Sequence, residues 1–323
     1  MSFINKLLNI ALPLATILVI PILMLPLLIF KILLSIKNFM CPENLATKVV
    51  LITGSASGIG EQLAYEYGRQ GAFLSLVDIK KDKLVAVADK ARSLGSPHVI
   101  IIGADVSKVE DCKRFVDETV NYFGHLDHLV NNAGIAMVKA VENCHDVSML
   151  SSVMDVNFWG AVYGTLFAIP HLKKRKGKIV VIASACGWYP LPTLSFYNAS
   201  KAAMISFFET LRTEVGWAIG ITIVTPGMIK TDLCMHDILD IESSMRIVPM
   251  GTAVECAKAV LKGVCRGDMY VTEPSWVKMM FPWKLLFPQF IDSAHRLVFR
   301  ISSNNSGTNQ NLHLSHTSEL KAE

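Results

Sequence analysis

The chain has little of what marks several classes of protein. Its formal net charge at pH 7 is only +4, and it has neither a basic run nor lysines interleaved with aromatic residues, so nucleic acid is not an expected partner. Its seven cysteines are odd in number, widely scattered and without paired metal-ligand spacing. Reduced thiols are therefore expected, and no metal site is predicted.

Charged residues are also missing from residues 7–30. As a helix, these 24 residues at about 1.5 Å each would cover the roughly 30 Å hydrocarbon layer of a membrane. Pro13, Pro21 and Pro26 argue against an undisturbed helix, so a bent insertion is an alternative to a straight span. A cleavable signal peptide is disfavoured because the run is long and lacks a small-residue cleavage site. We interpret residues 1–40 as a hydrophobic membrane anchor.

A strand, a glycine-rich turn and a helix follow one another directly after the anchor. Residues 48–53 are apolar and β-rich, and residues 61–70 have a helical pattern. The turn between them provides the candidate cofactor-binding residues Gly54, Ser55, Ser57, Gly58, Ile59 and Gly60. Glycines let the backbone approach a pyrophosphate, whose charge is favoured at a helix start. Asp78 ends a second strand 20 residues after Gly58, the spacing expected of a ribose-binding carboxylate.

The alternation of strands and helices continues through the chain. Residues 98–103, 126–131, 178–184 and 219–225 read as strands, and residues 80–94, 109–123, 147–171 and 194–217 read as helices. This rhythm predicts an α/β fold of the Rossmann type, a doubly wound parallel sheet. One catalytic domain, residues 46–275, accounts for the chain together with its appendages.

Three residues in the second half carry the predicted chemistry. Tyr197 and Lys201 stand four residues apart in a helical pattern, and Ser184 ends a strand that reads as buried and parallel. The carboxyl ends of such strands are where open α/β sheets bind ligands. A free phenol has a pKa of about 10, and a neighbouring ammonium would lower it. Because a proton must move when a hydride does, this set indicates a hydride-transfer enzyme.

Together these motifs resemble the short-chain dehydrogenase/reductase family over about residues 48–272. The matching patterns are Thr53-Gly54-x-x-x-Gly58-x-Gly60, Asn131-Asn132-Ala133-Gly134, Asn157, Ser184, Tyr197-x-x-x-Lys201 and Pro226-Gly227. Within that family the chain is similar to the plant 11β-hydroxysteroid dehydrogenase-like proteins, the steroleosins. Residues 60–67, 157–160, 195–201 and 270–276 carry this closer likeness.

The resemblance implies a role for each matching residue. Tyr197 would be the general acid or base, Lys201 would lower its pKa and hold the nicotinamide ribose, and Ser184 would bind the substrate oxygen. Four further residues would serve the relay and the cofactor: Asn157 by holding a water, Asp105 at the adenine, Asn132 in the cofactor cleft and Thr231 at the carboxamide.

The choice of cofactor depends on one position. Relatives that use NADP usually have basic residues where this chain has Asp78, whose carboxylate would repel a 2′-phosphate and accept hydrogen bonds from ribose hydroxyls. Lys80 and Lys81 reduce this contrast, and the resemblance itself points to NADP. The cofactor is therefore NAD or NADP, with NAD favoured by the local chemistry.

The predicted function is that of a membrane-anchored NAD(P)-dependent oxidoreductase that interconverts hydroxyl and keto groups on a steroid or related lipid. The alternative is a lipid-droplet structural or sterol-binding protein with little turnover. Residues 228–250 break the alternation where the family has its substrate lid. Its apolar residues could form a wall for a sterol or pack the lid onto the core: Met228, Ile229, Leu233, Met235, Ile238, Leu239 and Met245.

Location and assembly follow from the two ends of the chain and from the resemblance. Steroleosins have a comparable proline-bearing stretch that anchors them to oil bodies, so the anchor would lie in the endoplasmic reticulum, the lipid droplet or both. Lys31 and Lys37 follow the apolar run and only Lys6 precedes it, which favours a cytosolic catalytic domain. Residues 276–301 could form an interfacial segment or pack in a core or dimer. Residues 302–323 are expected to be disordered, and a homodimer through the long central helices is implied by resemblance.

Overall fold

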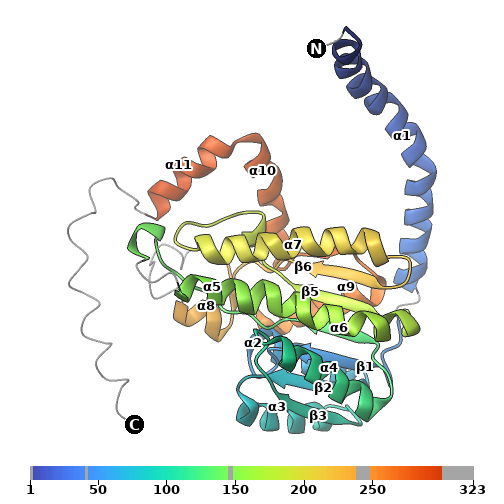
Figure 1. Cartoon of the computed structure of the whole chain (residues 1–323), viewed down its shortest axis with the longest axis vertical. Helices are drawn as coiled ribbons and strands as arrows, with labels where there is room; N and C mark the ends of the chain where they lie inside the picture. Colours follow the sequence, from blue (N-terminus) through green and yellow to red (C-terminus); the bar gives the residue numbers. More distant parts are fainter. Residues whose placement is uncertain (1–2, 41–42, 145–147, 238–247, 300–323) are drawn as a thin grey trace.

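The computed structural model describes residues 3–40, 43–144, 148–237 and 248–299. A seven-stranded parallel sheet with the order β3-β2-β1-β4-β5-β6-β9 forms its centre (Figure 1). The strands are β1 Val49–Thr53, β2 Phe73–Asp78, β3 Val99–Gly103, β4 His128–Asn131, β5 Lys178–Ile182, β6 Gly220–Val224 and β9 Tyr270–Val271. The strand order changes direction between β1 and β4, so the predicted doubly wound α/β fold is confirmed.

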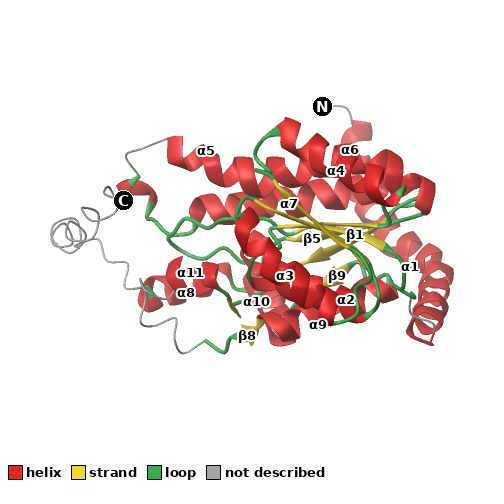
Figure 2. Cartoon of the chain, turned by 90° about the horizontal axis from the view of Figure 1, so that it is seen from below, coloured by secondary structure: helices red, strands yellow, loops and turns green. Residues whose placement is uncertain are grey.

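Helices cover both faces of this sheet, as Figure 2 shows. One face packs against α2 Gly58–Arg69, α3 Lys81–Ser93 and α9 Ala253–Arg266, and the other against α4 Val109–Phe123, α6 Gly160–Arg175 and α7 Ser195–Val215. Strand β1 serves both layers because successive side chains point to opposite faces. Val50 and Ile52 belong to one apolar cluster, and Val49 and Leu51 belong to the other.

Three parts of the fold differ from the sequence prediction. The helix expected over residues 147–171 is divided into α5 Ser148–Met154, a π-helical turn Asp155–Trp159 and α6, and residues 145–147 lie outside the described part. Strand β9 was not among the predicted strands. Within residues 228–250, the structure has β7 Ile229–Lys230 and α8 Asp232–Asp237, and β7 pairs with β8 Gly251–Thr252.

The apolar amino-terminal segment is one helix, α1 Phe3–Met40, which continues through its three prolines and is curved in Figure 1. Prolines remove backbone hydrogen bonds and bend helices, and this agrees with the expected disturbance. The stretch Leu7–Phe30 is 0% buried and is long and apolar enough to cross a membrane, by length and composition alone.

The last described part of the chain is a helical extension that we call the C-terminal arm. It consists of a 3-10 turn Ser275–Met279, α10 Met280–Leu286 and α11 Pro288–Val298. In Figure 1 the arm and the free end of α1 rise on the same side of the sheet. The predicted disordered tail, residues 302–323, lies outside the described residues.

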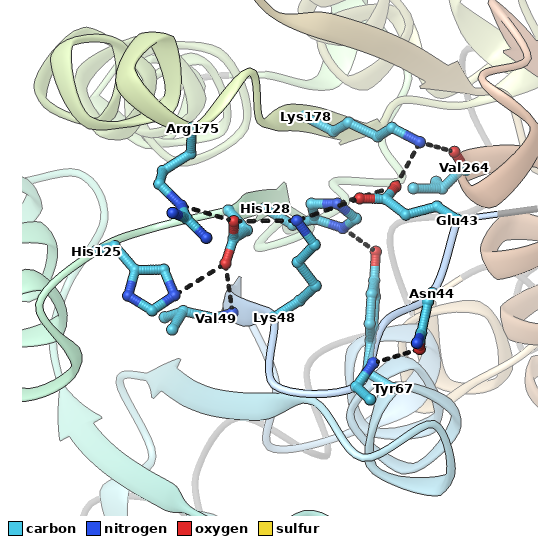
Figure 3. Close-up of polar contacts among 12 residues, drawn as sticks. Glu43, Asn44, Lys48, Val49, Tyr67, His125, His128, Arg175, Lys178 and Val264 are labelled. Carbon is cyan, nitrogen blue, oxygen red and sulfur yellow. Dashed lines mark hydrogen bonds and ion pairs between the residues drawn. The ribbon is translucent and has the colours of Figure 1, made fainter.

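A cluster of charged side chains ties the segment after α1 to the amino-terminal edge of the sheet (Figure 3). Glu43 Oε2 lies 2.6 Å from Lys178 Nζ and 3.5 Å from His128 Nε2. The other ring nitrogen of His128 is 3.2 Å from the Tyr67 hydroxyl. Burial acts to raise the pKa of Glu43, but hydrogen bonds and positive charge from His128 and Lys178 outweigh it and lower the pKa to about 2.

Asp127 is the second carboxylate at this edge, and its side chain is only 1% exposed. It accepts a hydrogen bond from the Val49 amide at 2.9 Å and forms ion pairs with Lys48 at 3.3 Å and Arg175 at 3.2 Å. Burial acts to raise its pKa, but these partners and His125 lower it. Glu43, Lys48, Asp127, His128 and Lys178 are referred to below as the junction cluster.

Candidate active site

A cavity of about 790 Å³ opens at the carboxyl ends of the central strands. One part is lined by the glycine-rich turn and by residues that follow β2, β3 and β4. The rest is lined by residues that follow β5 and β6, by the start of α7 and by the C-terminal arm. A single cavity thus joins the predicted nucleotide site to the predicted reacting residues.

The glycine-rich turn is held by the loop that follows β4. The Asn132 side chain donates to the Thr53 carbonyl at 3.0 Å and to the Gly54 carbonyl at 2.8 Å. A Cβ at Gly54 would lie 2.6 Å from Ala133 Cα, and Gly54 has a φ of +64°. Both facts require glycine there. A Cβ at Gly60 would lie 2.2 Å from the Gly54 carbonyl oxygen, so Gly60 allows α2 to start directly against the turn.

Two carboxylates line the nucleotide part of the cavity. Asp78 ends β2, and its two oxygens accept from the Ala56 amide at 3.0 Å and the Lys80 amide at 2.9 Å. Asp105 follows β3, and one of its oxygens accepts from the amide and the hydroxyl of Ser107. These hydrogen bonds hold both carboxylates in place on the cavity wall.

Ser184, Tyr197 and Lys201 meet in the interior of the cavity. Ser184 follows β5, and its hydroxyl donates to the Pro226 carbonyl at 3.5 Å and accepts from the Cys186 amide at 3.1 Å. Lys201 lies one turn after Tyr197 on α7, and its ammonium is 5.7 Å from the centre of the phenol ring. Lys201 is 3% exposed and donates to the Ile182 carbonyl at 3.0 Å. The structure therefore brings the predicted triad together.

Burial controls the ionisation of this triad. It raises the pKa of the Tyr197 phenol, charge at Cys186 adds to that effect, and interaction with Ser184 only partly opposes it. It also lowers the pKa of Lys201 to about 8. The expectation that Lys201 would set a low pKa at Tyr197 is therefore not met in the protein alone. The main physical reason is the removal of the phenolate from water, and charge at Cys186 acts in the same direction.

Asn157 is fully buried in the π-helical turn, close to the triad but not on the cavity wall. Its side-chain oxygen accepts from the Ile135 amide at 2.8 Å, and its nitrogen donates to the Ile135 carbonyl at 2.9 Å and to the Ser200 hydroxyl at 2.9 Å. The side chain thus fixes the loop after β4 against α7.

Most of the predicted site residues line the one cavity: Gly54, Ser57, Gly58, Ile59, Asp78, Asp105, Asn132, Ser184, Tyr197, Lys201 and Thr231. Thr231 lies against the glycine-rich turn, because a Cβ at Gly58 would be 3.3 Å from its methyl group. Ser55 and Gly60 do not line the cavity. Ser55 is buried and donates its hydroxyl to the Val77 carbonyl at 3.2 Å, so it supports the turn from beneath.

Sequence reasoning missed the contribution of the C-terminal arm to the cavity. Six arm residues and Phe299, which directly follows the arm, line it: Trp276, Val277, Met280, Ala294, His295, Val298 and Phe299. The predicted domain boundary at residue 275 separates these residues from the site that they help to form. The mixed aromatic and apolar composition of the arm was the available signal, but it is equally typical of a membrane interface.

The predicted lid contributes part of its apolar wall. Met228, Ile229 and Leu233 line the cavity. The side chains of Met235, Ile238, Leu239 and Met245 lie outside the described part of the chain.

A family model described as short chain dehydrogenase matches residues 48–240. The chain belongs to the short-chain dehydrogenase/reductase family and is an oxidoreductase. Among plant relatives, it is 47% identical over 310 residues to the 11-beta-hydroxysteroid dehydrogenase 1A of Arabidopsis thaliana, with 93% of this chain and 89% of the relative covered. It is 49% identical over 290 residues to the 11-beta-hydroxysteroid dehydrogenase-like 4A of the same plant, with 90% and 97% covered. The likeness to this plant group, predicted from the motifs, is confirmed.

A solved structure supports the fold independently. The short-chain dehydrogenase/reductase of Burkholderia phymatum, determined in complex with NAD, matches with a TM-score of 0.70. Its sequence identity to this chain is 22%, and the match covers 77% of this chain and 96% of that one.

Proposed function

We propose that the protein is a membrane-anchored, NAD(P)-dependent oxidoreductase that interconverts a hydroxyl and a keto group on a steroid or related lipid. The observation that carries this proposal is the single cavity of about 790 Å³ that contains the triad, the glycine-rich turn and an apolar wall. A cavity of this volume is large enough for a nicotinamide ring and a lipophilic substrate. The names of the plant relatives, hydroxysteroid dehydrogenases, support the substrate class.

In the proposed reaction, the triad handles the proton while the nicotinamide gives or takes the hydride. Ser184 and Tyr197 hydrogen-bond the reacting oxygen, and Tyr197 gives or accepts the proton. Lys201 holds the nicotinamide ribose, and with the nucleotide bound its ammonium would favour the phenolate form of Tyr197. A water held at the π-helical turn of Asn157 would continue the proton relay. Burial of the site keeps bulk water away from the reacting carbon.

The nucleotide part of the cavity fits a dinucleotide. The glycine-rich turn and the start of α2 would hold the pyrophosphate, Asp105 and Asn132 would flank the adenosine half, and Thr231 would contact the carboxamide. We infer a preference for NAD because Asp78 lies where a 2′-phosphate would otherwise bind. A lower Michaelis constant for NADP than for NAD in the purified protein would refute that preference.

We propose that α1 anchors the catalytic domain and that the outer face of the C-terminal arm rests on the same membrane surface. The exposed apolar side chains of the arm support this: Met279, Phe281, Trp283, Leu285, Leu286, Phe290 and Leu297, with exposed fractions between 46% and 80%. The compartment would be the endoplasmic reticulum, the lipid droplet or both, with the catalytic domain in the cytosol. A homodimer through α5, α6 and α7 remains a proposal from family resemblance.

The direct test is turnover of a steroid panel by purified full-length protein in detergent, with NAD and NADP in separate assays. The proposal expects oxidation or reduction of at least one hydroxy- or keto-steroid, with a matching change in nicotinamide absorbance. Tight steroid binding without turnover under either cofactor would instead favour the sterol-binding alternative. If the protein neither binds nor turns over any of these steroids, the proposed substrate class is rejected.

A further inference from the structure

The C-terminal arm is attached to the loop that directly follows Ser184. The Lys284 ammonium on α10 donates to the Trp188 carbonyl, and the Phe281 ring meets the Trp188 ring edge-on at 5.5 Å. On α11, the His295 ring meets the Tyr189 ring edge-on at 5.3 Å. Two adjacent residues of one loop therefore hold both helices of the arm. A ligand in the cavity would contact the triad and α11 within one continuous wall.

His295 is the titratable residue that the arm contributes to the cavity wall. The other arm residues there are apolar or aromatic, such as Met280, Ala294 and Val298. The imidazole is fixed on two sides by rings, Tyr189 at 5.3 Å and Phe299 at 6.1 Å. Within residues 3–40, 43–144, 148–237 and 248–299, neither ring nitrogen of His295 has a hydrogen bond. Its orientation is thus set by aromatic packing, and its polar atoms remain available to a ligand.

The charge state of this imidazole suits an uncharged partner. Burial lowers the pKa of His295, and Asp292, three residues earlier on α11, only partly opposes the effect. At pH 7 the ring is therefore mainly neutral, with one nitrogen as donor and the other as acceptor. Such a ring can donate to a carbonyl or accept from a hydroxyl, whereas an anionic carboxylate would gain little from it.

We propose that His295 is a specificity-determining residue, which hydrogen-bonds a second oxygen of the lipophilic substrate while Ser184 and Tyr197 bind the reacting oxygen. This inference rests on the proposed steroid or related lipid substrate and deepens it. It defines the substrate as a rigid apolar body with two separate polar groups. The imidazole is half-buried, and a bound substrate would cover it further. An analogue that lacks the matching oxygen would leave the covered imidazole unpaired, so the site would discriminate against that analogue.

The experiment uses full-length protein and a series of 11-hydroxy- and 11-keto-steroids from which the oxygens at C3, C17, C20 and C21 are removed one at a time. Wild type is expected to prefer one parent steroid over its matching deoxy analogue by at least about 10-fold in kcat/KM. In His295→Phe, which preserves the aromatic packing, that ratio should fall to within about 2-fold. His295→Gln should retain part of the preference because its amide both donates and accepts.

Arg296→Gln is the matched control, because Arg296 is exposed on the next position of α11 and does not line the cavity. It should leave the wild-type ratio unchanged. The proposal is overturned if His295→Phe keeps the wild-type preference. It is also overturned if the substitution lowers kcat/KM equally for parent and deoxy steroids, which is the result expected of a purely structural role.

Equilibrium dialysis with the same steroids separates this inference from the proposed reaction. If wild type turns over none of them, the proposed function fails. The ratio of dissociation constants between parent and deoxy steroid still tests whether His295 recognises the second oxygen. If wild type binds none of them, both proposals are rejected. Loss of the binding preference in His295→Phe but not in Arg296→Gln supports the inference in either case.

Discussion

Burial has opposite outcomes for the ionisable groups at the two edges of the central sheet, the amino-terminal and the carboxyl-terminal ends of its strands. At the amino-terminal edge, Glu43 and Asp127 have cationic partners that more than offset burial, so the pKa values of both carboxyls are lowered. At the carboxyl edge, burial prevails: the pKa of Tyr197 is raised and that of Lys201 is lowered to about 8. None of the ion pairs among the described residues includes Lys201, whose ammonium donates to a backbone carbonyl.

This difference indicates that charged groups at one edge of the sheet serve mainly stability, whereas those at the other edge serve the reaction. Paired charges at the junction cluster stabilise the fold and tie the segment after α1 to β4 and β5. Groups at the other edge bear the full effect of burial, which is the condition in which an added ligand has the largest influence on their ionisation. Substitutions at the two edges should therefore have opposite signatures in rate and stability measurements.

The largest expected effect is that of Tyr197→Phe. It removes the proposed proton donor while keeping the ring, so kcat should fall by about 10³-fold. Nucleotide affinity and the thermal midpoint should change little. Steady-state kinetics would measure kcat and the Michaelis constant for the nucleotide, and differential scanning fluorimetry would measure the thermal midpoint. Tyr122→Phe is the control, since Tyr122 is 62% exposed and far from the triad in sequence. A kcat within 10-fold of wild type would refute the role of the phenol.

A pair of lysine substitutions compares the two edges directly. Lys201→Met should lower kcat/KM by about 10²-fold and leave the thermal midpoint unchanged or raised, because a buried and unpaired charge is lost. Lys178→Met should lower the thermal midpoint and leave kcat/KM unchanged, since it removes the partner 2.6 Å from Glu43 while the triad is intact. Equal losses of activity in the two variants would contradict the separation of stability from chemistry.

A smaller effect is expected from Glu43→Gln, which should lower the free energy of unfolding by about 2 kcal/mol at pH 7. The pKa of Glu43 is lowered from an ordinary 4.5 to about 2 in the folded protein, so its stabilisation is present above pH 4.5. It is lost as the pH falls toward 2. Urea unfolding at several pH values should show the difference from wild type shrinking over that window. An unchanged kcat/KM at pH 7 would be consistent with a structural role.

Nucleotide affinity should show the smallest of these effects. With its pKa lowered to about 8, Lys201 is mainly protonated at pH 7 and mainly neutral at pH 9.5. Because a neutral amine holds ribose hydroxyls less strongly than an ammonium, the dissociation constant should rise several-fold across that range. Titration calorimetry of wild type and Lys201→Met would test this, and the variant should show a flat profile. If the dissociation constant of wild type does not change between pH 7 and pH 9.5, the prediction that the charge of Lys201 contributes to nucleotide binding is wrong.

Much of the fold was predictable because each element has a local signal. The apolar runs that become β1, β2, β3 and β5 and the turn at Gly54 follow from periodicity and from backbone sterics. The triad was predictable because its spacing is fixed by one helix and one strand end. Strand β9 was missed because two residues are too few for a periodic pattern. The π-helical turn at Asp155–Trp159 was missed because a continuous helical pattern runs through it.

Contacts between distant segments account for the rest. Glu43, His128 and Lys178 are far apart in the sequence and meet only because β4 and β5 are neighbours and the segment after α1 crosses their ends. His295 reaches the cavity for a similar reason, since α11 folds back onto Tyr189. Neither arrangement has a period or a motif. Only tertiary packing assigns one set of charges to stability and one imidazole to the cavity.

A crystal structure of the full chain with a nicotinamide nucleotide and a non-reacting steroid analogue tests the central claim most directly. The account predicts that the Tyr197 and Ser184 hydroxyls both lie about 2.6–3.2 Å from the same steroid oxygen, with the nicotinamide ring facing the carbon that carries it. It also predicts the Lys201 ammonium at the nicotinamide ribose. A steroid oxygen out of reach of Tyr197, or a nucleotide bound away from Lys201, would contradict it.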